Sequence, residues 1–272
     1  MVRRVLVSPL TMLGLFLVAA IIILAIFAPW IAPKDPLEVN LGQKLLPPSS
    51  EHWFGTDEVG RDILSRIIFG TRISLKIGLL VVVIAFPIGT VLGAIAGYVG
   101  GMVDQVIMRM TDIFLSFPGI ILSMSIAAAL GPSIENVLLA LAITWWPWYT
   151  RIVRSSVLSI KSSEFIESAR AIGANPLRIL FKDIIPNSIA PASIQASLDL
   201  GFVILAAAGL SFIGLGAQPP SPEWGAMLSS SREILRDAWW AATFPGLAIL
   251  LTVLGFNLLG DGLRDLLDPK NR

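Results

Sequence analysis

The sequence predicts an all-α, polytopic membrane protein with six transmembrane helices. Of its 272 residues, 55% are hydrophobic and 14% are charged, and the mean hydropathy is +0.78. These values exclude an ordinary water-soluble globule. Several long runs carry no charge, and a helix of about 20 apolar residues crosses a hydrocarbon core about 30 Å thick. Backbone amides find no water in that core, so such segments must be helical, whereas barrel strands would show short alternating segments.

Six segments are expected to span the membrane. The first follows two arginines, as a signal peptide does, but it is long and has no clear small-residue cleavage site, so we expect it to be retained. The glycines at four-residue spacing toward the end of the second span, Gly93, Gly97 and Gly101, predict close helix packing, and the pair Gly100–Gly101 is read in the same way. The spans are expected at residues 10–31, 74–98, 112–130, 134–150, 192–216 and 239–260.

The distribution of basic residues favours a cytoplasmic location for both termini. With that orientation, the cytoplasmic segments hold most of the 20 Lys and Arg residues, as the positive-inside rule expects. These cytoplasmic residues are Arg3, Arg4, Arg109, Arg151, Arg154, Lys161, Arg170, Arg178, Lys182, Arg264, Lys270 and Arg272.

Aromatic residues gather at the ends of the predicted spans. There an amphipathic ring can meet lipid headgroups, so we interpret them as membrane anchors and assign none of them to a site. They are Trp30, the cluster of Trp145, Trp146, Trp148 and Tyr149, and the pair Trp239 and Trp240.

Residues 32–73 are rich in proline and serine near their start, which predicts an external loop. Late in this segment Thr56 is suited to cap a helix with Asp57 and Glu58 in its first turn, followed by isoleucines and a leucine on one face. We expect an amphipathic helix lying at the outer interface. Its charged residues are expected to be solvated or ion-paired: Arg61, Asp62 and Arg66.

The polar segment 151–191 is too long for a plain connector between packed helices. Ser163 is suited to cap a short helix ending at Ile172, and Gly173 can supply a left-handed stop. Asn175 and Pro176 then predict the start of a second helix that Pro186 interrupts. The small residues around this turn would let another protein approach closely, so the unit is interpreted as a docking knob.

Enzymatic and nucleic-acid functions lack support in the sequence. There is no P-loop, no H-E-x-x-H, no G-x-S-x-G and no cysteine, and His52 is the single histidine. We therefore expect no bound cofactor, no metal and no catalytic activity. The net charge of +1 and the scattered basic residues argue against nucleic acid as a partner.

Asp199 is an acidic residue inside the fifth predicted span. Intramembrane acids often line a polar path, but this one could also hydrogen-bond to a neighbouring helix, such as the one bearing Asn257. Both readings stay open, and Asp199 and Asn257 are kept as candidate residues of a translocation path.

Four separated stretches of the chain resemble a known family. Glu167-Ser168-Ala169, then Gly173, then Ile185-Pro186-Asn187 resemble the EAA loop of the membrane subunits of bacterial and archaeal ABC importers. Ser168 stands where that pattern has Ala, and Asp183 and Ile185 stand where it usually has Ile and Leu. Residues 52–66, 210–225 and 257–265 are similar to the second membrane subunit of dipeptide, oligopeptide and nickel importers. The resemblance covers nearly the whole chain.

The resemblance implies an ABC type I importer permease fold in the cell membrane. It implies an N-terminal part at 1–73, with one helix, an external loop and an amphipathic segment, and a permease core at 74–272 with a coupling loop at 151–191. The implied ATPase-coupling residues are Glu164, Glu167, Ser168, Ala169, Arg170, Gly173, Ala174, Pro186 and Asn187.

The same resemblance implies partners and a cargo. The partners would be a homologous permease subunit, two ATP-binding subunits that use the ATP, an extracytoplasmic substrate-binding protein and the lipid bilayer. Short peptides are the expected cargo, and nickel, glutathione or oligosaccharides are alternatives. An ion-coupled secondary transporter, suggested by Asp199 and the missing nucleotide motif, is the rival class, with a membrane-embedded enzyme a distant third.

Overall fold

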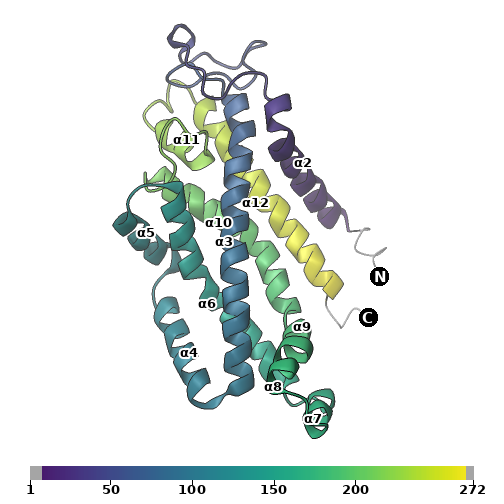
Figure 1. Cartoon of the computed structure of the whole chain (residues 1–272). Helices are drawn as coiled ribbons and strands as arrows, with labels where there is room; N and C mark the ends of the chain where they lie inside the picture. The colour runs from purple at the N-terminus through teal and green to yellow at the C-terminus, as the bar shows by residue number, and fades with distance from the viewer. Residues whose placement is uncertain (1–7, 268–272) are drawn as a thin grey trace.

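The computed structural model describes residues 8–267, which form a bundle of helices (Figure 1). Within that range the β-type pairing is limited to one isolated bridge between Thr56 and Asp62, which confirms the all-α prediction. Four basic residues used in the orientation argument lie outside the described residues: Arg3, Arg4, Lys270 and Arg272. The elements are α2 (Pro9–Ile31), η1 (Leu41–Gln43), α3 (Ile63–Val99), α4 (Gly101–Leu115), α5 (Gly119–Leu130), α6 (Ile134–Ile160), α7 (Glu164–Ala171), α8 (Pro176–Arg178), η2 (Ile179–Ile184), α9 (Ile185–Ser188), α10 (Ala190–Phe212), α11 (Trp224–Ser230) and α12 (Trp240–Leu267).

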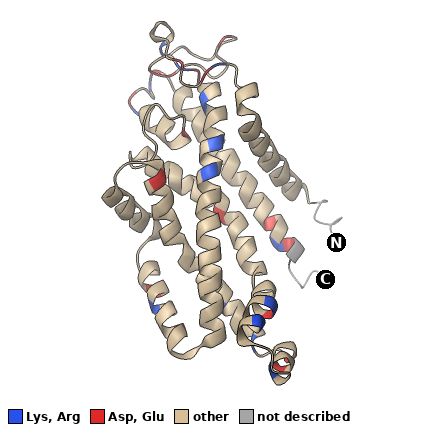
Figure 2. Ribbon diagram, in the orientation of Figure 1, with Lys and Arg blue, Asp and Glu red and all other residues tan. Residues whose placement is uncertain are grey.

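The number of spans differs from the predicted six. Four helices are long and apolar enough to cross a membrane, namely α2, α3, α10 and α12, and the pair α4 and α5 makes five if it is one broken span. Helix α6 is 27 residues long but is not among them. Six spans are therefore not confirmed by the described part of the chain. Charged residues lie mostly toward the two ends of the bundle (Figure 2).

The third predicted span, 112–130, is not one helix. Helix α4 ends at Leu115, α5 begins at Gly119, and the two are bent by 84°. Pro118 lies in the break, where a proline disfavours helical backbone in the preceding residue and has no N–H to donate. The prediction of one straight span is wrong for this physical reason.

The expected amphipathic helix is the first part of the second span. Helix α3 starts at Ile63 and runs without interruption through residue 73 to Val99. Asp62, not Thr56, caps it: the Asp62 carboxylate accepts the N–H of Ser65 at 2.8 Å. Thr56 instead pairs with Asp62 in a tight turn. The prediction of a separate helix beginning after Thr56 is wrong because the carboxylate six residues later provides the cap.

Helices α3 and α6 pack closely through glycines. A Cβ on Gly93 would lie 2.5 Å from the Thr150 carbonyl oxygen, and one on Gly97 would lie 2.8 Å from Val157, so the packing role predicted for both is confirmed. Gly89 belongs to the same contact, which extends the pattern toward the N-terminal end of α3. Gly101 does not: nothing lies within 4 Å of its would-be Cβ, and its φ of +57° helps to turn the chain from α3 into α4.

Only some of the predicted aromatic anchors are exposed. Trp30, Trp148 and Trp239 are 77%, 52% and 53% exposed, in keeping with that interpretation. Trp145, Trp146 and Tyr149 are instead buried, and so is Trp240, whose indole N–H donates to the Thr56 carbonyl at 3.1 Å. The anchor prediction is wrong for these four because tertiary packing on α6 and beneath the 32–62 segment covers them.

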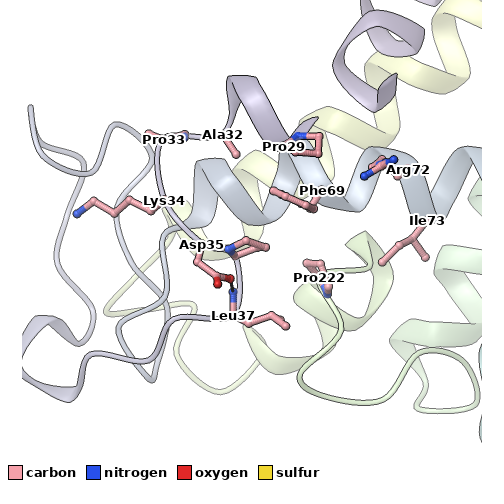
Figure 3. Close-up of a pocket in the computed structure, with 11 residues that line it drawn as sticks. Pro29, Ala32, Pro33, Lys34, Asp35, Leu37, Phe69, Arg72, Ile73 and Pro222 are labelled. Carbon is pink, nitrogen blue, oxygen red and sulfur yellow. Dashed lines mark hydrogen bonds between the residues drawn. The ribbon is translucent and has the colours of Figure 1, made fainter. Parts of the chain in front are cut away.

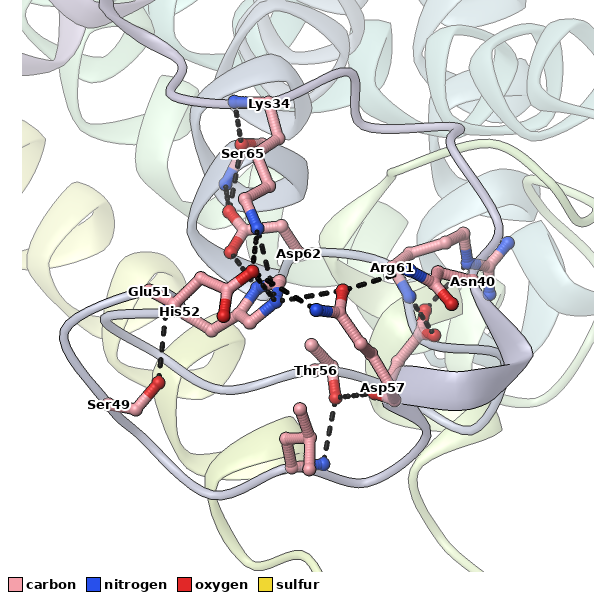
Figure 4. Close-up of polar contacts among 12 residues, drawn as sticks. Lys34, Asn40, Ser49, Glu51, His52, Thr56, Asp57, Arg61, Asp62 and Ser65 are labelled. Carbon is pink, nitrogen blue, oxygen red and sulfur yellow. Dashed lines mark hydrogen bonds and ion pairs between the residues drawn. The ribbon is translucent and has the colours of Figure 1, made fainter.

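Residues 32–62 form a cap over the end of the bundle opposite to α7, held by buried polar groups (Figure 4). His52 is 1% exposed, and its Nδ1 lies 2.9 Å from the Asp62 carboxylate that caps α3. Arg61 pairs with Asp57 at 2.6 Å. Arg61, Asp62 and Arg66 are all buried, so solvation holds for none of them, and the ion-paired alternative holds for Arg61 and Arg66, which both pair with Asp57.

Arg66 connects the cap to the loop before α11. Its guanidinium donates to the carbonyls of Pro36 at 3.0 Å, Pro220 at 3.3 Å and Ser221 at 3.2 Å. A planar fork of N–H donors suits several carbonyl acceptors at once, which an ammonium on a flexible stem does not. Arg66 therefore fixes two loops that are distant in sequence against the start of α3.

Replacing Arg66 with methionine is expected to lower the free energy of unfolding by about 3 kcal/mol, because it leaves buried carbonyls without donors and Asp57 with one cation fewer. The measurement is thermal unfolding in detergent, with limited proteolysis of residues 32–62. Arg72→Met, on the exposed side of the same helix, is the matched control and should stay within about 0.5 kcal/mol. Equal losses for the two variants would contradict this role.

Candidate functional site

The segment between α6 and α10 projects from the bundle at the end opposite to the cap (Figure 1). Helix α7 begins after Ser163, whose carbonyl accepts the N–H groups of Ile166 at 3.0 Å and Glu167 at 3.1 Å. The short helix between Ser163 and Ile172 is thus confirmed. The predicted side-chain cap is wrong, because the Ser163 hydroxyl donates to the Ile160 carbonyl at 2.6 Å instead.

Gly173 turns the chain out of α7. Its φ is +75°, and its N–H donates to Arg170 O at 3.0 Å, while Ala174 N–H donates to Ala169 O at 3.1 Å. These bonds satisfy carbonyls at the helix end, as a left-handed stop does. Asn175 then accepts the Leu177 N–H at 2.8 Å and starts α8. Both the stop and the second cap are confirmed.

The predicted coupling residues lie on two sides of this knob, which we define as residues 163–181. Ile166 is fully buried, and Ala169 and Ala174 pack against the core of the bundle. The polar residues of α7 face outward and are exposed, and so is Gly173: Glu164, Glu167, Ser168 and Arg170. Large apolar side chains are exposed beside them: Ile172 at 82%, Leu177 at 65%, Phe181 at 54% and Phe165 at 48%. Exposed apolar side chains and charged side chains therefore lie side by side on the surface of the knob.

The knob is tied to the end of α3. Lys161 donates to the Gly97 carbonyl at 3.3 Å, and the guanidinium of Arg170 lies 5.5 Å from the centre of the Tyr98 ring. Leu180 and Ile184 of η2 are buried in the same core. The segment around α7 therefore contacts the end of α3 and is continuous through η2 with the chain that leads to α10.

Pro186 does not interrupt the helical path. The backbone continues from α8 through the π-helical η2 and α9, and α10 begins at Ala190. Pro186 lies in the first turn of α9, where its missing N–H leaves no bond unmade. The predicted break is wrong for that reason. Pro186 and Asn187 are exposed at the base of the segment, away from the α7 turn, and Asn187 donates to Asp183 O at 2.6 Å.

A cavity of about 390 Å³ lies between α5, α6 and α10 and is reached by Asp199. Asp199 is 7% exposed, and its Oδ1 accepts from the Gln195 amide at 2.9 Å. Among the described residues, its Oδ2 and the buried Tyr149 hydroxyl have no hydrogen-bond partner, although the two groups lie near each other. The lining residues are Gly119, Ile120, Thr144, Trp145, Trp148, Ile152, Gln195, Asp199 and Phe202.

The structure does not bring the two candidate path residues together. Asn257 is exposed on α12, and no lining residue of the cavity belongs to that helix. The polar neighbour of Asp199 is Gln195, one helical turn earlier on α10. Sequence reasoning missed Gln195, although its spacing of four residues was visible, and it missed Trp145 because the whole aromatic cluster was interpreted as membrane anchors.

A larger cavity of about 750 Å³ lies at the cap end (Figure 3). It is lined by the end of α2 and the loop that follows α2, by α3, and by the loop before α11. Its wall is mainly apolar, with Pro29, Phe69 and Pro222, and Arg72 contributes the charge on α3. The Lys34 side chain extends away from it in Figure 3, toward Glu51 and His52. Sequence reasoning did not find this cavity, which forms from three separate segments.

Glu223 is a further buried acid at the same end. It is 1% exposed and caps α11 by accepting the N–H groups of Gly225 at 3.0 Å and Ala226 at 2.9 Å. Burial raises the pKa of the Glu223 carboxyl, because the charged form loses water, and the two N–H groups offset part of that effect. Its role is to start α11.

Known proteins match this chain over nearly its whole length. The model of the binding-protein-dependent transport system inner membrane component matches residues 89–272, and that of the N-terminal TM domain of oligopeptide transport permease C matches residues 1–48. The chain is 50% identical to the probable D,D-dipeptide transport system permease protein DdpC of Escherichia coli K12, over 97% of this chain and 88% of the relative. It is 51% identical to the dipeptide permease DppC of Alkalihalophilus pseudofirmus, over 97% and 86%.

A third relative carries a different cargo name. The glutathione transport system permease protein GsiD of Escherichia coli O6:K15:H31 is 48% identical, over 98% of this chain and 89% of the relative. Among solved structures, an inward-facing form of the MetNI methionine ABC transporter aligns with a TM-score of 0.61 at 20% identity, over 76% of this chain and 98% of that chain. This likeness supports the predicted permease fold. With membrane-length helices and these matches, the chain is a multi-pass membrane protein that belongs to the family of binding-protein-dependent transport system inner membrane components.

Proposed function

We propose that this chain is a permease subunit of an ATP-driven importer of short peptides. The observation that carries the proposal is the sequence similarity to two relatives named as dipeptide permeases. About half of the aligned residues are identical, over 97% of this chain. The exposed knob at residues 163–181 supports it, because a permease without a nucleotide site needs a surface through which a separate ATPase can act. The chain itself binds no cofactor and has no enzyme activity, and the ATP is used by partner subunits.

Each proposed partner corresponds to a part of the molecule. Two ATP-binding subunits serve the transporter, one of them at the knob, where Phe165, Ile172 and Leu177 are exposed. A homologous permease covers the face of α4 and α5, whose apolar side chains are widely exposed. An extracytoplasmic binding protein meets the cap. Both termini and the knob then lie in the cytoplasm, and the cap lies outside.

In the proposed cycle, closure of the ATPases pushes the knob as a unit. Because Lys161 and Arg170 contact the end of α3, and η2 leads into α10, the push tilts these helices between inward-open and outward-open arrangements. Helix α4 is held to α6 by two ion pairs, Arg154 with Asp104 at 2.6 Å and Arg151 with Asp112 at 2.7 Å. In the proposed cycle α4 therefore moves together with α6.

The test is purification of the chain from its native membrane, followed by uptake in vesicles. We expect a second permease and two ATPases to co-purify, and uptake of labelled dialanine to require both ATP and the binding protein. Labelled glutathione is the competing cargo, because of the GsiD relative, and a nickel chelate is the second control. A solitary chain with proton-driven uptake would contradict the importer, and uptake of glutathione without dialanine would contradict the peptide cargo.

A further inference from the structure

We propose that the cavity between α5, α6 and α10 binds the ammonium group of a peptide amino terminus, with the Asp199 carboxylate as its anionic ligand. This inference rests on the proposed peptide permease function and gives it a chemical subsite. Three observations support it: the buried Asp199 carboxylate lines the cavity, aromatic side chains line the same cavity, and the cavity opens onto an exposed face of the chain.

The carboxylate of Asp199 is buried on the wall of the cavity. Gln195 donates to Oδ1 at 2.9 Å, which fixes the group from its own helix. Oδ2 is enclosed by protein atoms near the Tyr149 hydroxyl and accepts no hydrogen bond within the described residues. Asp199 as a whole is 7% exposed, so its charge is poorly hydrated, and a cation in the cavity that donates N–H to the carboxylate would offset that cost.

Aromatic rings line the same cavity as the carboxylate. The rings of Trp145 on α6 and Phe202 on α10 are 6.2 Å apart, and Trp148 also lines the cavity. The faces of such rings attract ammonium groups, most strongly for tryptophan. A carboxylate with neighbouring indole rings is therefore suited to an organic ammonium ion.

The cavity opens onto an exposed face of the chain. Ile120, Trp148 and Phe202 line it and are 53%, 52% and 51% exposed. A carboxylate in the middle of a membrane helix is costly beside hydrocarbon, so a hollow that contains one must face a polar path instead of lipid. In the proposed assembly this face points toward the passage between the two permeases.

The donor set favours an ammonium group over a metal ion. Calcium and magnesium take about six or more oxygen ligands, whereas one carboxylate reaches this cavity and no cluster of three metal-binding side chains occurs among the described residues. An ammonium group supplies three N–H donors. A volume of about 390 Å³ is within the range of small-molecule sites, enough for the first residue of a peptide.

The test introduces one thiol into this chain and uses the assembled transporter. The chain has no cysteine, so Ile120→Cys places a single reactive group in this chain at the mouth of the cavity. The rate of maleimide labelling of this chain is measured in lipid nanodiscs without the binding protein, with increasing dialanine or N-acetyl-dialanine, and with sodium chloride alone. Uptake of dialanine by the unsubstituted transporter is measured in parallel.

We expect dialanine to slow labelling, and N-acetyl-dialanine to need at least about a tenfold higher concentration, because acetylation removes the charge. Asp199→Asn, with the same shape and no charge, should abolish this difference, while Tyr149→Phe should preserve it because the carboxylate remains. Equal protection by both peptides, no protection by either, protection by sodium chloride alone, or an unchanged difference in Asp199→Asn would each overturn the site. If one of these labelling results is found while the unsubstituted transporter still takes up dialanine, only the proposed binding site is wrong. If the unsubstituted transporter takes up no dialanine, the proposed peptide permease function is itself contradicted.

Discussion

Gly93→Ala is expected to impair folding of the whole bundle, although it adds a single methyl group. That carbon would lie 2.5 Å from the Thr150 carbonyl oxygen and 3.0 Å from Val153 Cβ, where α3 and α6 touch. The obstacle includes backbone of α6, which cannot rotate away as a flexible side chain can. Forcing extra volume into a packed contact costs about 1–3 kcal/mol, and small residues at such contacts are what lets membrane helices approach.

The measurement is the yield of chain in the membrane and its thermal unfolding in detergent. Gly246→Ala is the matched control, since nothing lies within 4 Å of its would-be Cβ and its φ is not in the left-handed region. We expect the control to behave like the unsubstituted chain, and Gly93→Leu to be worse than Gly93→Ala. Indistinguishable unfolding of Gly93→Ala and Gly246→Ala would show that the contact between α3 and α6 is less close than described.

Gly173→Val is expected to reduce ATP-driven uptake at least about tenfold while leaving the chain in the membrane. The φ of Gly173 is +75°, and left-handed backbone costs an ordinary residue about 1–2 kcal/mol, with β-branched residues worst. Nothing lies within 4 Å of a Cβ at this position, so the effect comes from backbone strain and not from a clash within the chain. Relief of that strain moves α7 relative to α8 and misplaces the knob.

Asparagine tolerates left-handed backbone, so Gly173→Asn is the matched control and should retain most of the uptake. Uptake and ATP hydrolysis are measured together in vesicles that contain the full assembly. Loss of uptake with continued, unstimulated hydrolysis would identify a coupling defect, whereas loss of the ATPase subunits from the assembly would identify a docking defect. Normal coupling in Gly173→Val would argue against a coupling role for this turn.

The apolar runs predicted the positions of α2, α3, α10 and α12, whereas six spans are not confirmed within the described residues. Helix α6 extends beyond the predicted end of the fourth span and carries Arg151 and Arg154. In the structure these cations pair with Asp112 and Asp104 of α4. Pairing across helices is a tertiary event, so a window along one segment cannot detect it.

The knob was predictable to within a residue because local rules determine its geometry. A left-handed glycine at 173 and an asparagine cap at 175 act over a single turn of backbone, and both kept their predicted roles. Pro186 did not keep its predicted role. A proline breaks a helix when it lies in the interior, but it is tolerated in the first turn, where Pro186 lies. Which of the two applies depends on where the preceding helix stops, and the π-helical segment η2 decided that.

The sequence by itself determined the membrane setting, the all-helical class, the turn at Gly173 and the resemblance that names the family, because these depend on composition and on contacts between near neighbours. The tertiary structure alone decided the cap held by Arg66, the contact of α3 with α6 at Gly93 and the cavity at Asp199. Each of these joins segments far apart along the chain, and the energy of a buried group depends on what surrounds it in space. The sequence shows an acidic residue at position 199, but only the packing of α6 against α10 places Asp199 in one cavity with the rings of Trp145 and Phe202.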